Sequence, residues 1–284
     1  MKIGIGLPNP VPGTTGQQLL AWARRAEERG FSSLATIDRI AYPSYESIIA
    51  LTGAAAVTER IGLVTNVLLG PTRNPVLLAK EAASLDQISG GRLTLGLGVG
   101  AREDDFEVTG RDFRTRGKRF DQDLETIHAA WRGELVEGAG HPVGPSPVRG
   151  DRIPVLIGGM SDAAIQRTIT WAVGWTVGGA PPEHGGPFAE RVRHAWKDAG
   201  RGGAPHIVGL AYFGMGDEPA ERAAHYLDTY YGDFGPTIAQ RMSKTPDELR
   251  DIVKRFEGFG FDELFLDPTD PDTAQVDLVA DAVL

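Results

Sequence analysis

Residues 61–93 read IGLVTNVLLGPTRNPVLLAKEAASLDQISGGRL and contain one complete strand and one complete helix. The apolar run at 61–69 predicts a buried strand, and Asn74-Pro75 supplies an N-cap with proline at the first helical position. Apolar side chains then recur on one helical face, at Leu78, Ala82, Leu85 and Ile88. Gly90-Gly91 ends the helix. The stretch predicts a strand–helix unit of the kind found in parallel sheets.

The same unit recurs along the whole chain. Eight apolar runs, each followed by a helical pattern, predict strands at 3–7, 33–37, 61–69, 93–99, 153–157, 175–178, 207–213 and 263–266. Eight such units in a chain of 284 residues predict an α/β protein with a (β/α)8 TIM-barrel fold, taken as a single domain over residues 1–284. A doubly wound open sheet is the alternative arrangement of the same elements.

Composition excludes several classes of protein. Lys and Arg number 29 against 38 Asp and Glu, and the net charge of −9 disfavours nucleic acid and anionic membranes as partners. Cysteine is absent, which excludes disulfides, thiolate metal sites and a cysteine nucleophile. The six histidines show no metal-binding spacing, so we expect no metal site. No apolar run has the length of a membrane span or a signal peptide, and we expect a cytoplasmic protein.

In a barrel, functional side chains lie at the carboxyl ends of the strands. Asp38 and Arg39 follow the second strand, where they could orient a polar ligand or simply form an ion pair that ties down a loop. Thr65 and Asn66 interrupt the apolar third strand and need hydrogen-bond partners, which a bound ring or the neighbouring backbone could supply.

Glycines follow the fourth and fifth strands. Residues 96–101 (GLGVGA) formally match the dinucleotide-binding pattern, but a polar segment follows them instead of a helix, and we reject that interpretation. The glycines leave room for a flat ligand or for close backbone packing, and Asp104 and Asp105 are expected on a solvated face. After the fifth strand, Gly158-Gly159 and Ser161 precede a helix, which favours a phosphate site over an ordinary N-cap.

Three stretches resemble the bacterial luciferase-like flavin oxidoreductases, which include FMN-dependent monooxygenases and enzymes of the 8-hydroxy-5-deazaflavin coenzyme. They are residues 61–93, residues 95–131 (LGLGVGAREDDFEVTGRDFRTRGKRFDQDLETIHAAW) and residues 153–175 (IPVLIGGMSDAAIQRTITWAVGW). The second stretch resembles the deazaflavin branch. The resemblance implies a (β/α)8 barrel with the cofactor across the strand ends and a cis peptide at Asn66-Val67.

The resemblance also implies the residues of the site. It places Asp38 beside the polar edge of the cofactor ring, and it places further cofactor contacts at Asn66, Val67, Val99, Gly100, Gly158, Gly159, Met160 and Ser161. Thr65 is added to the expected cofactor contacts because a bound ring could satisfy its hydroxyl. Two positions depart from the family pattern. Arg39 replaces a common histidine, so with Asp38 it is expected to be catalytic by stabilising a developing anion, because a guanidinium is a poor proton shuttle. Val99 replaces a phosphate-binding arginine.

The resemblance implies an oxidoreductase that acts on a small organic molecule. The reaction is monooxygenation with reduced FMN or hydride transfer with the deazaflavin coenzyme (F-420 type), and the sequence leaves this choice open. A separate reductase could supply the reduced cofactor, and a homodimer is expected, with Trp22 or the 75–89 helix contributing to its interface. The alternative is a non-catalytic flavin-binding or partner subunit of a luciferase-like enzyme.

Overall fold

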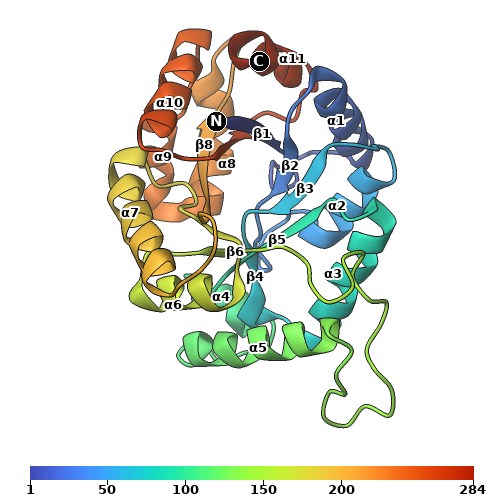
Figure 1. Ribbon diagram of the computed structural model, residues 1–284. Coiled ribbons are helices and arrows are strands. Elements are labelled where there is room, and N and C mark those ends of the chain that lie inside the picture. The colour runs from blue at the N-terminus through green and yellow to red at the C-terminus, as the bar shows by residue number, and fades with distance from the viewer.

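A computed structural model describes residues 1–284, and it confirms the (β/α)8 barrel (Figure 1). The strands are β1 (Lys2–Gly6), β2 (Ser33–Thr36), β3 (Gly62–Thr65), β4 (Leu68–Leu69), β5 (Leu93–Gly98), β6 (Val155–Gly158), β7 (Gly174–Thr176), β8 (His206–Phe213) and β9 (Glu263–Pro268). All pairings are parallel, and pairing of β3 with β5 closes the sheet. β3 and β4 are two parts of one barrel strand, so the barrel has the eight strands that the sequence predicts.

Helices surround the ring of strands in Figure 1. They are α1 (Gly16–Arg29), α2 (Ser47–Ala55), α3 (Pro75–Ser89), α4 (Glu103–Glu107), α5 (Arg116–Trp131), α6 (Asp162–Trp171), α7 (Pro182–Asp198), α8 (Pro219–Tyr231), α9 (Gly235–Arg241), α10 (Pro246–Gly258) and α11 (Ala274–Val283). The short helix α4 lies where the sequence predicted only a polar loop. No helix has both the length and the apolar character that crossing a membrane requires.

Local sequence sets the helix ends. α1 begins at a capping box formed by Thr15 and Gln18, and α3 begins at Asn74, whose side chain accepts hydrogen bonds from two backbone N–H groups. Gly90 ends α3 in the left-handed conformation. One residue of the predicted apolar face of α3 is exposed: Ile88 follows Leu78 by ten residues, and at 3.6 residues per turn it rotates out of the buried stripe.

The core consists of a shell between strands and helices and two smaller clusters. Inside the barrel, one cluster contains Ala35, Val64, Leu156, Val208 and Phe265. At the carboxyl ends of the strands, a second cluster joins the barrel to α8; it contains Val11, Ile37, Leu210, Tyr212, Ala223, Tyr226, Leu227, Tyr230 and Met242. We call this second group the mouth cluster. α8 therefore packs over the end of the barrel where the functional residues are expected.

One expectation about the dimer interface is wrong. The indole of Trp22 is fully buried in the shell around the barrel, so it cannot contact a second subunit. Trp22 lies on the amphipathic helix α1, and its ring packs inward because a large apolar ring gains most from complete burial.

Candidate active site

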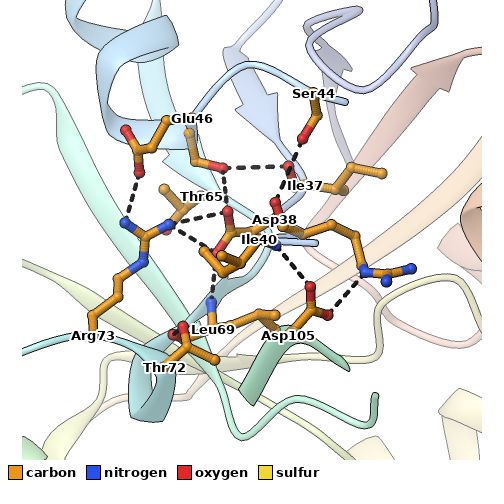
Figure 2. Close-up of polar contacts among 12 residues, drawn as sticks. Ile37, Asp38, Ile40, Ser44, Glu46, Thr65, Leu69, Thr72, Arg73 and Asp105 are labelled. Carbon is orange, nitrogen blue, oxygen red and sulfur yellow. Dashed lines mark hydrogen bonds and ion pairs between the residues drawn. The ribbon is translucent and has the colours of Figure 1, made fainter. Parts of the chain in front are cut away.

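Asp38 follows β2 and is buried in a polar network that joins three segments (Figure 2). Its carboxylate accepts hydrogen bonds from the backbone N–H of Leu69 at 3.0 Å and from Nη2 of Arg73 at 3.1 Å, and the hydroxyl of Ser47 lies 3.3 Å away. Arg73 also pairs with Glu46 at 2.8 Å. Burial raises the pKa of Asp38, and the Arg73 guanidinium opposes this shift. The carboxylate holds the ends of β2 and β4 together.

Arg39 points to a different set of partners. Its Nη2 lies 2.6 Å from Asp104, its Nε lies 2.8 Å from Oδ2 of Asp105, and its Nη1 donates to the carbonyl of Tyr230 at 3.1 Å. Arg39 is buried, although the sequence left open a ligand-facing role. Asp38 and Arg39 therefore belong to two separate ion-pair networks and do not pair with each other.

The expectation that Asp105 lies on a solvated face is wrong. Asp105 is buried, and besides Arg39 it accepts hydrogen bonds at 2.8 Å from the backbone N–H groups of Ile40 and Ala41. Asp104 is half exposed, as a surface carboxylate would be. The reason is α4, which turns Asp105 inward and Asp104 outward, so two adjacent carboxylates occupy different environments.

The break between β3 and β4 carries the cis peptide at Asn66-Val67 that the family resemblance implied. The hydroxyl of Thr65 donates to the carbonyl of Gly96 at 2.7 Å, so neighbouring backbone satisfies it. Asn66 is buried, and its Oδ1 accepts a hydrogen bond from the hydroxyl of Thr176 on β7 at 2.8 Å. The Nδ2 group of Asn66 has no partner. A buried amide donor without a partner is costly unless a ligand supplies one.

The glycines of β5 and β6 make room for this break. A Cβ on Gly96 would lie 1.9 Å from the carbonyl oxygen of Thr65, and one on Gly98 would lie 2.7 Å from Cγ2 of Val67. A Cβ on Gly158 would lie 3.1 Å from the other methyl group of Val67. Of the two interpretations of the alternate glycines, close packing is therefore the one observed in the structure, and the rejected dinucleotide pattern has this simpler explanation.

Val99 and Gly100 follow β5 at the edge of the barrel mouth. Val99 is half-buried, and the carbonyl of Gly100 accepts a hydrogen bond from Nε of Arg116 at 3.1 Å. Gly100 has φ +75°, and a Cβ there would lie 3.1 Å from the ring of Phe106. These residues connect the end of β5 to α4 and α5.

The predicted phosphate segment is exposed. Gly159, Met160 and Ser161 are all exposed, Gly159 has φ +109°, and Ser161 caps α6 by accepting from the N–H of Ala164 at 3.2 Å. Asp162, the first residue of α6, pairs with Arg191 at 2.5 Å. The N-cap is thus observed, whereas the phosphate role stays a prediction.

Sequence reasoning missed Asp267 and the tyrosines around it. Asp267 lies at the end of β9 and is buried, and its Oδ1 has no hydrogen-bond partner. Burial raises its pKa to about 8. The hydroxyls of Tyr212 and Tyr231 lie 2.5 Å apart, and the hydroxyl of Tyr226 has no partner. The signal was available, because an aspartate that directly follows an apolar barrel strand occupies the position where functional residues are expected.

A cleft of about 670 Å³ opens beside Tyr212. Its lining comes from the loop after β7, from α7, β8, α9 and α10, and includes Leu210, Tyr212 and Met242 of the mouth cluster. Charged side chains, among them Glu183, Asp247 and Arg241, also line it. Its size suits a small organic molecule.

Comparison with known proteins identifies the family. A model of the luciferase-like monooxygenase family matches residues 1–244. The chain belongs to this family. A relative in Mycobacterium tuberculosis, an uncharacterised protein, is 32% identical over 208 residues, which cover 63% of this chain and 71% of that protein.

Two solved structures share the luciferase-like fold. Monooxygenase RslO1 from Streptomyces bottropensis has a TM-score of 0.81 at 23% identity, over 100% of this chain and 98% of that one. An F420-dependent secondary alcohol dehydrogenase, solved with an F420–acetone adduct, has a TM-score of 0.80 at 16% identity, over 99% of this chain and 98% of that one. At these identities the likeness concerns the fold alone. Membership of the family supports an oxidoreductase activity.

Proposed function

We propose that this protein uses reduced FMN or the 8-hydroxy-5-deazaflavin coenzyme to oxidise or reduce a small organic molecule. The observation that carries the proposal is the buried Nδ2 group of Asn66, which Thr176 orients and which lacks a partner in the protein. A flat heterocycle with carbonyl and ring-nitrogen acceptors would satisfy it. Reduced FMN would support monooxygenation, and the deazaflavin would support hydride transfer.

The residues present fit such a cofactor at both ends. Asn66 and Val67 would face the ring, Val99 and Gly100 would border it, and the backbone of 158–161 would meet the phosphate at the start of α6. The salt bridge between Asp162 and Arg191 offsets the carboxylate charge at that helix end.

Asp38 and Arg39 act in this proposal as positioning residues. Asp38 fixes the chain on both sides of the β3–β4 break through the N–H of Leu69 and the guanidinium of Arg73. Arg39 joins the loop after β2 to α4 and α8 through Asp105 and the carbonyl of Tyr230. Both would hold the walls of the cofactor site in place.

One observation favours a second candidate function. Arg39 stands where the family resemblance implies a common histidine, and its guanidinium is already engaged by two carboxylates. A non-catalytic, flavin-binding partner subunit would tolerate that loss of a proton-transfer group.

We also propose a homodimer and a separate reductase that supplies the reduced cofactor. Two neighbouring helices support the dimer: Ile49 on α2 and Leu77 on α3 are 68% and 54% exposed. A dimer would bury these two apolar side chains, which the single chain leaves in contact with water.

The test is anaerobic titration of the protein with reduced FMN and, separately, with the reduced deazaflavin coenzyme. Tight binding of FMN, followed by rapid reoxidation when oxygen is admitted, would select the monooxygenase. Binding of the deazaflavin alone would select hydride transfer. If neither cofactor binds below roughly 1 mM, which corresponds to about −4 kcal/mol, the proposed catalytic function is wrong.

A further inference from the structure

Asp267 faces the interior of the barrel at its carboxyl-terminal mouth. It follows Phe265 by two residues on the same face of β9, and Phe265 belongs to the cluster inside the barrel. A Cβ on Gly6 of β1 would lie 2.4 Å from Oδ1 of Asp267, so the carboxyl group lies against the bare backbone of the neighbouring strand. On the other side, Asp267 is in register with Tyr212 of β8.

The surroundings of Asp267 contain hydroxyl groups but no cation. Tyr212 lies on β8, and Tyr226 and Tyr231 lie on α8. Burial raises the pKa of each phenol, and Asp267 lies close enough to add to that shift when it is ionised. Arg39 and Arg102 lie over the rings of Tyr230 and Tyr231, and neither guanidinium bonds to Asp267. A buried carboxyl group without a cation or a hydrogen-bond donor favours its neutral form.

We infer that Asp267 is the hydrogen-bond donor of this site, and that its neutral carboxyl group binds an oxygen atom that carries or develops negative charge on a bound molecule. A protonated carboxylic acid has a donor that an ionised one lacks, and in an apolar site such a donor stabilises an oxyanion strongly. The inference rests on the proposed function in one respect, the identity of the molecule that supplies the oxygen atom. That atom belongs either to the carbonyl edge of the cofactor or to a carbonyl, enolate or phenolate group of the substrate.

The cleft beside α9 supplies a route to this donor. Its lining includes Tyr212, the register partner of Asp267, and the hydroxyl of Tyr212 bonds to Tyr231 at the base of the cap formed by α8. A ring bound over Leu210 and Met242 would lie against Tyr212. Asp267 is not among the residues that line the cleft, so the bound molecule would reach its carboxyl group by displacing the side chain of Tyr212.

The experiment uses 4-nitrophenol as the probe, because the absorbance of its anion differs from that of the neutral phenol. Binding is measured from pH 6 to 9, at pH values about one unit apart, for the wild type, Asp267→Asn, Asp267→Leu and the control Asp123→Asn. Asp123 is a buried carboxyl group on α5, outside the mouth cluster, and burial raises its pKa to about 6. The same variants are titrated with oxidised FMN and with the oxidised deazaflavin coenzyme.

We expect the wild type to bind the phenolate and to lose it above about pH 8, where Asp267 ionises and repels it. Asp267→Leu should bind about tenfold more weakly, as expected for loss of a hydrogen bond to a charged group. Asp267→Asn keeps an N–H donor, so it should bind within about threefold of the wild type at pH 7 and lose the decline above pH 8. Asp123→Asn should match the wild type.

The two ligands distinguish the source of the oxygen atom. If Asp267→Leu weakens binding of a cofactor but not of the phenolate, the oxygen belongs to the cofactor; the converse assigns it to the substrate. If neither affinity depends on residue 267, or if Asp267→Asn retains the decline above pH 8, the inference is wrong. Failure of the wild type to bind either cofactor would overturn the proposed function alone, because the phenolate measurement needs no cofactor.

Discussion

Arg39 and Asp105 form an ion pair in which both side chains are almost fully buried. Nε of Arg39 lies 2.8 Å from Oδ2 of Asp105, and the two side chains are 5% and 1% exposed. The pair joins the loop after β2 to α4, and the carbonyl of Tyr230 extends the link to α8. Three segments that follow different strands are therefore held together at one edge of the barrel mouth.

Replacing Arg39 with leucine should destabilise the protein by about 3–5 kcal/mol, because it leaves the Asp105 carboxylate buried without its cation. Urea denaturation measures the change. The matched control is Arg191→Leu, which breaks the exposed pair with Asp162 and should cost less than about 1 kcal/mol. The double variant Arg39→Leu/Asp105→Asn should recover part of the loss. Equal effects of the two arginine substitutions would show that the buried pair contributes no more than an exposed one.

The barrel could be predicted from the sequence, whereas this ion pair could not. Strands and helices follow from local periodicity, caps and glycines, as at Asn74 and Gly90. The partner of Arg39 lies 66 positions away on a five-residue helix, and a run such as Glu103-Asp104-Asp105 does not reveal which carboxylate turns inward. That choice depends on how α4 is placed against the loop after β2, which is a tertiary effect.

Gly98→Ala should lower stability by about 1–3 kcal/mol, because its Cβ would lie 2.7 Å from Cγ2 of Val67 in a closely packed wall. Cofactor affinity should fall as well if Val67 shifts. Gly140→Ala is the control, since a Cβ at that position meets no atom within 4 Å. Truncating the opposing side chain in Gly98→Ala/Val67→Ala should relieve the clash. Thermal unfolding measures the stability of Gly98→Ala, of Gly140→Ala and of the double variant. An unchanged stability in Gly98→Ala would show that the wall is packed less closely than the distances indicate.

Asn66→Leu tests the donor on which the proposed function depends. Loss of the Nδ2 group should weaken cofactor binding by about tenfold, the effect of removing one hydrogen bond to a buried acceptor. Thr176→Val is the control for lost orientation: it removes only the hydroxyl that holds Oδ1 of Asn66 and should weaken binding less. Isothermal titration with FMN and with the deazaflavin measures both. If Asn66→Leu binds both cofactors with unchanged affinity, the amide of Asn66 does not contact the cofactor.

The candidate site was only partly accessible to sequence reasoning. Asn66 and Thr65 were recognisable because polar residues interrupt an apolar strand, but their partners, Thr176 and the carbonyl of Gly96, come from other strands. Asp267 directly follows the strand predicted at 263–266, so the same logic applied to it, and it was missed. The structure adds what the sequence does not show: this carboxyl group belongs to β9, and its Oδ1 has no hydrogen-bond partner.

Asp267→Asn should change how stability depends on pH. Burial raises the pKa of Asp267 to about 8 in the folded protein, whereas an aspartate in an unfolded chain has a pKa of about 3.9. Between these values the folded state holds a proton that the unfolded state has released, so this carboxyl group stabilises the fold fully below about pH 4 and loses that contribution as the pH rises to about 8. The slope is at most about 1.4 kcal/mol per pH unit.

The difference in unfolding free energy between the wild type and Asp267→Asn isolates this contribution. Urea denaturation at intervals from pH 5 to 9 should show the wild type losing stability relative to the variant until about pH 8, with no further relative loss above it. Asp123→Asn should show its relative change ending near pH 6, where the folded carboxyl group of Asp123 titrates. A constant difference between wild type and Asp267→Asn across the range would mean that Asp267 is ionised in the folded protein and cannot act as a donor.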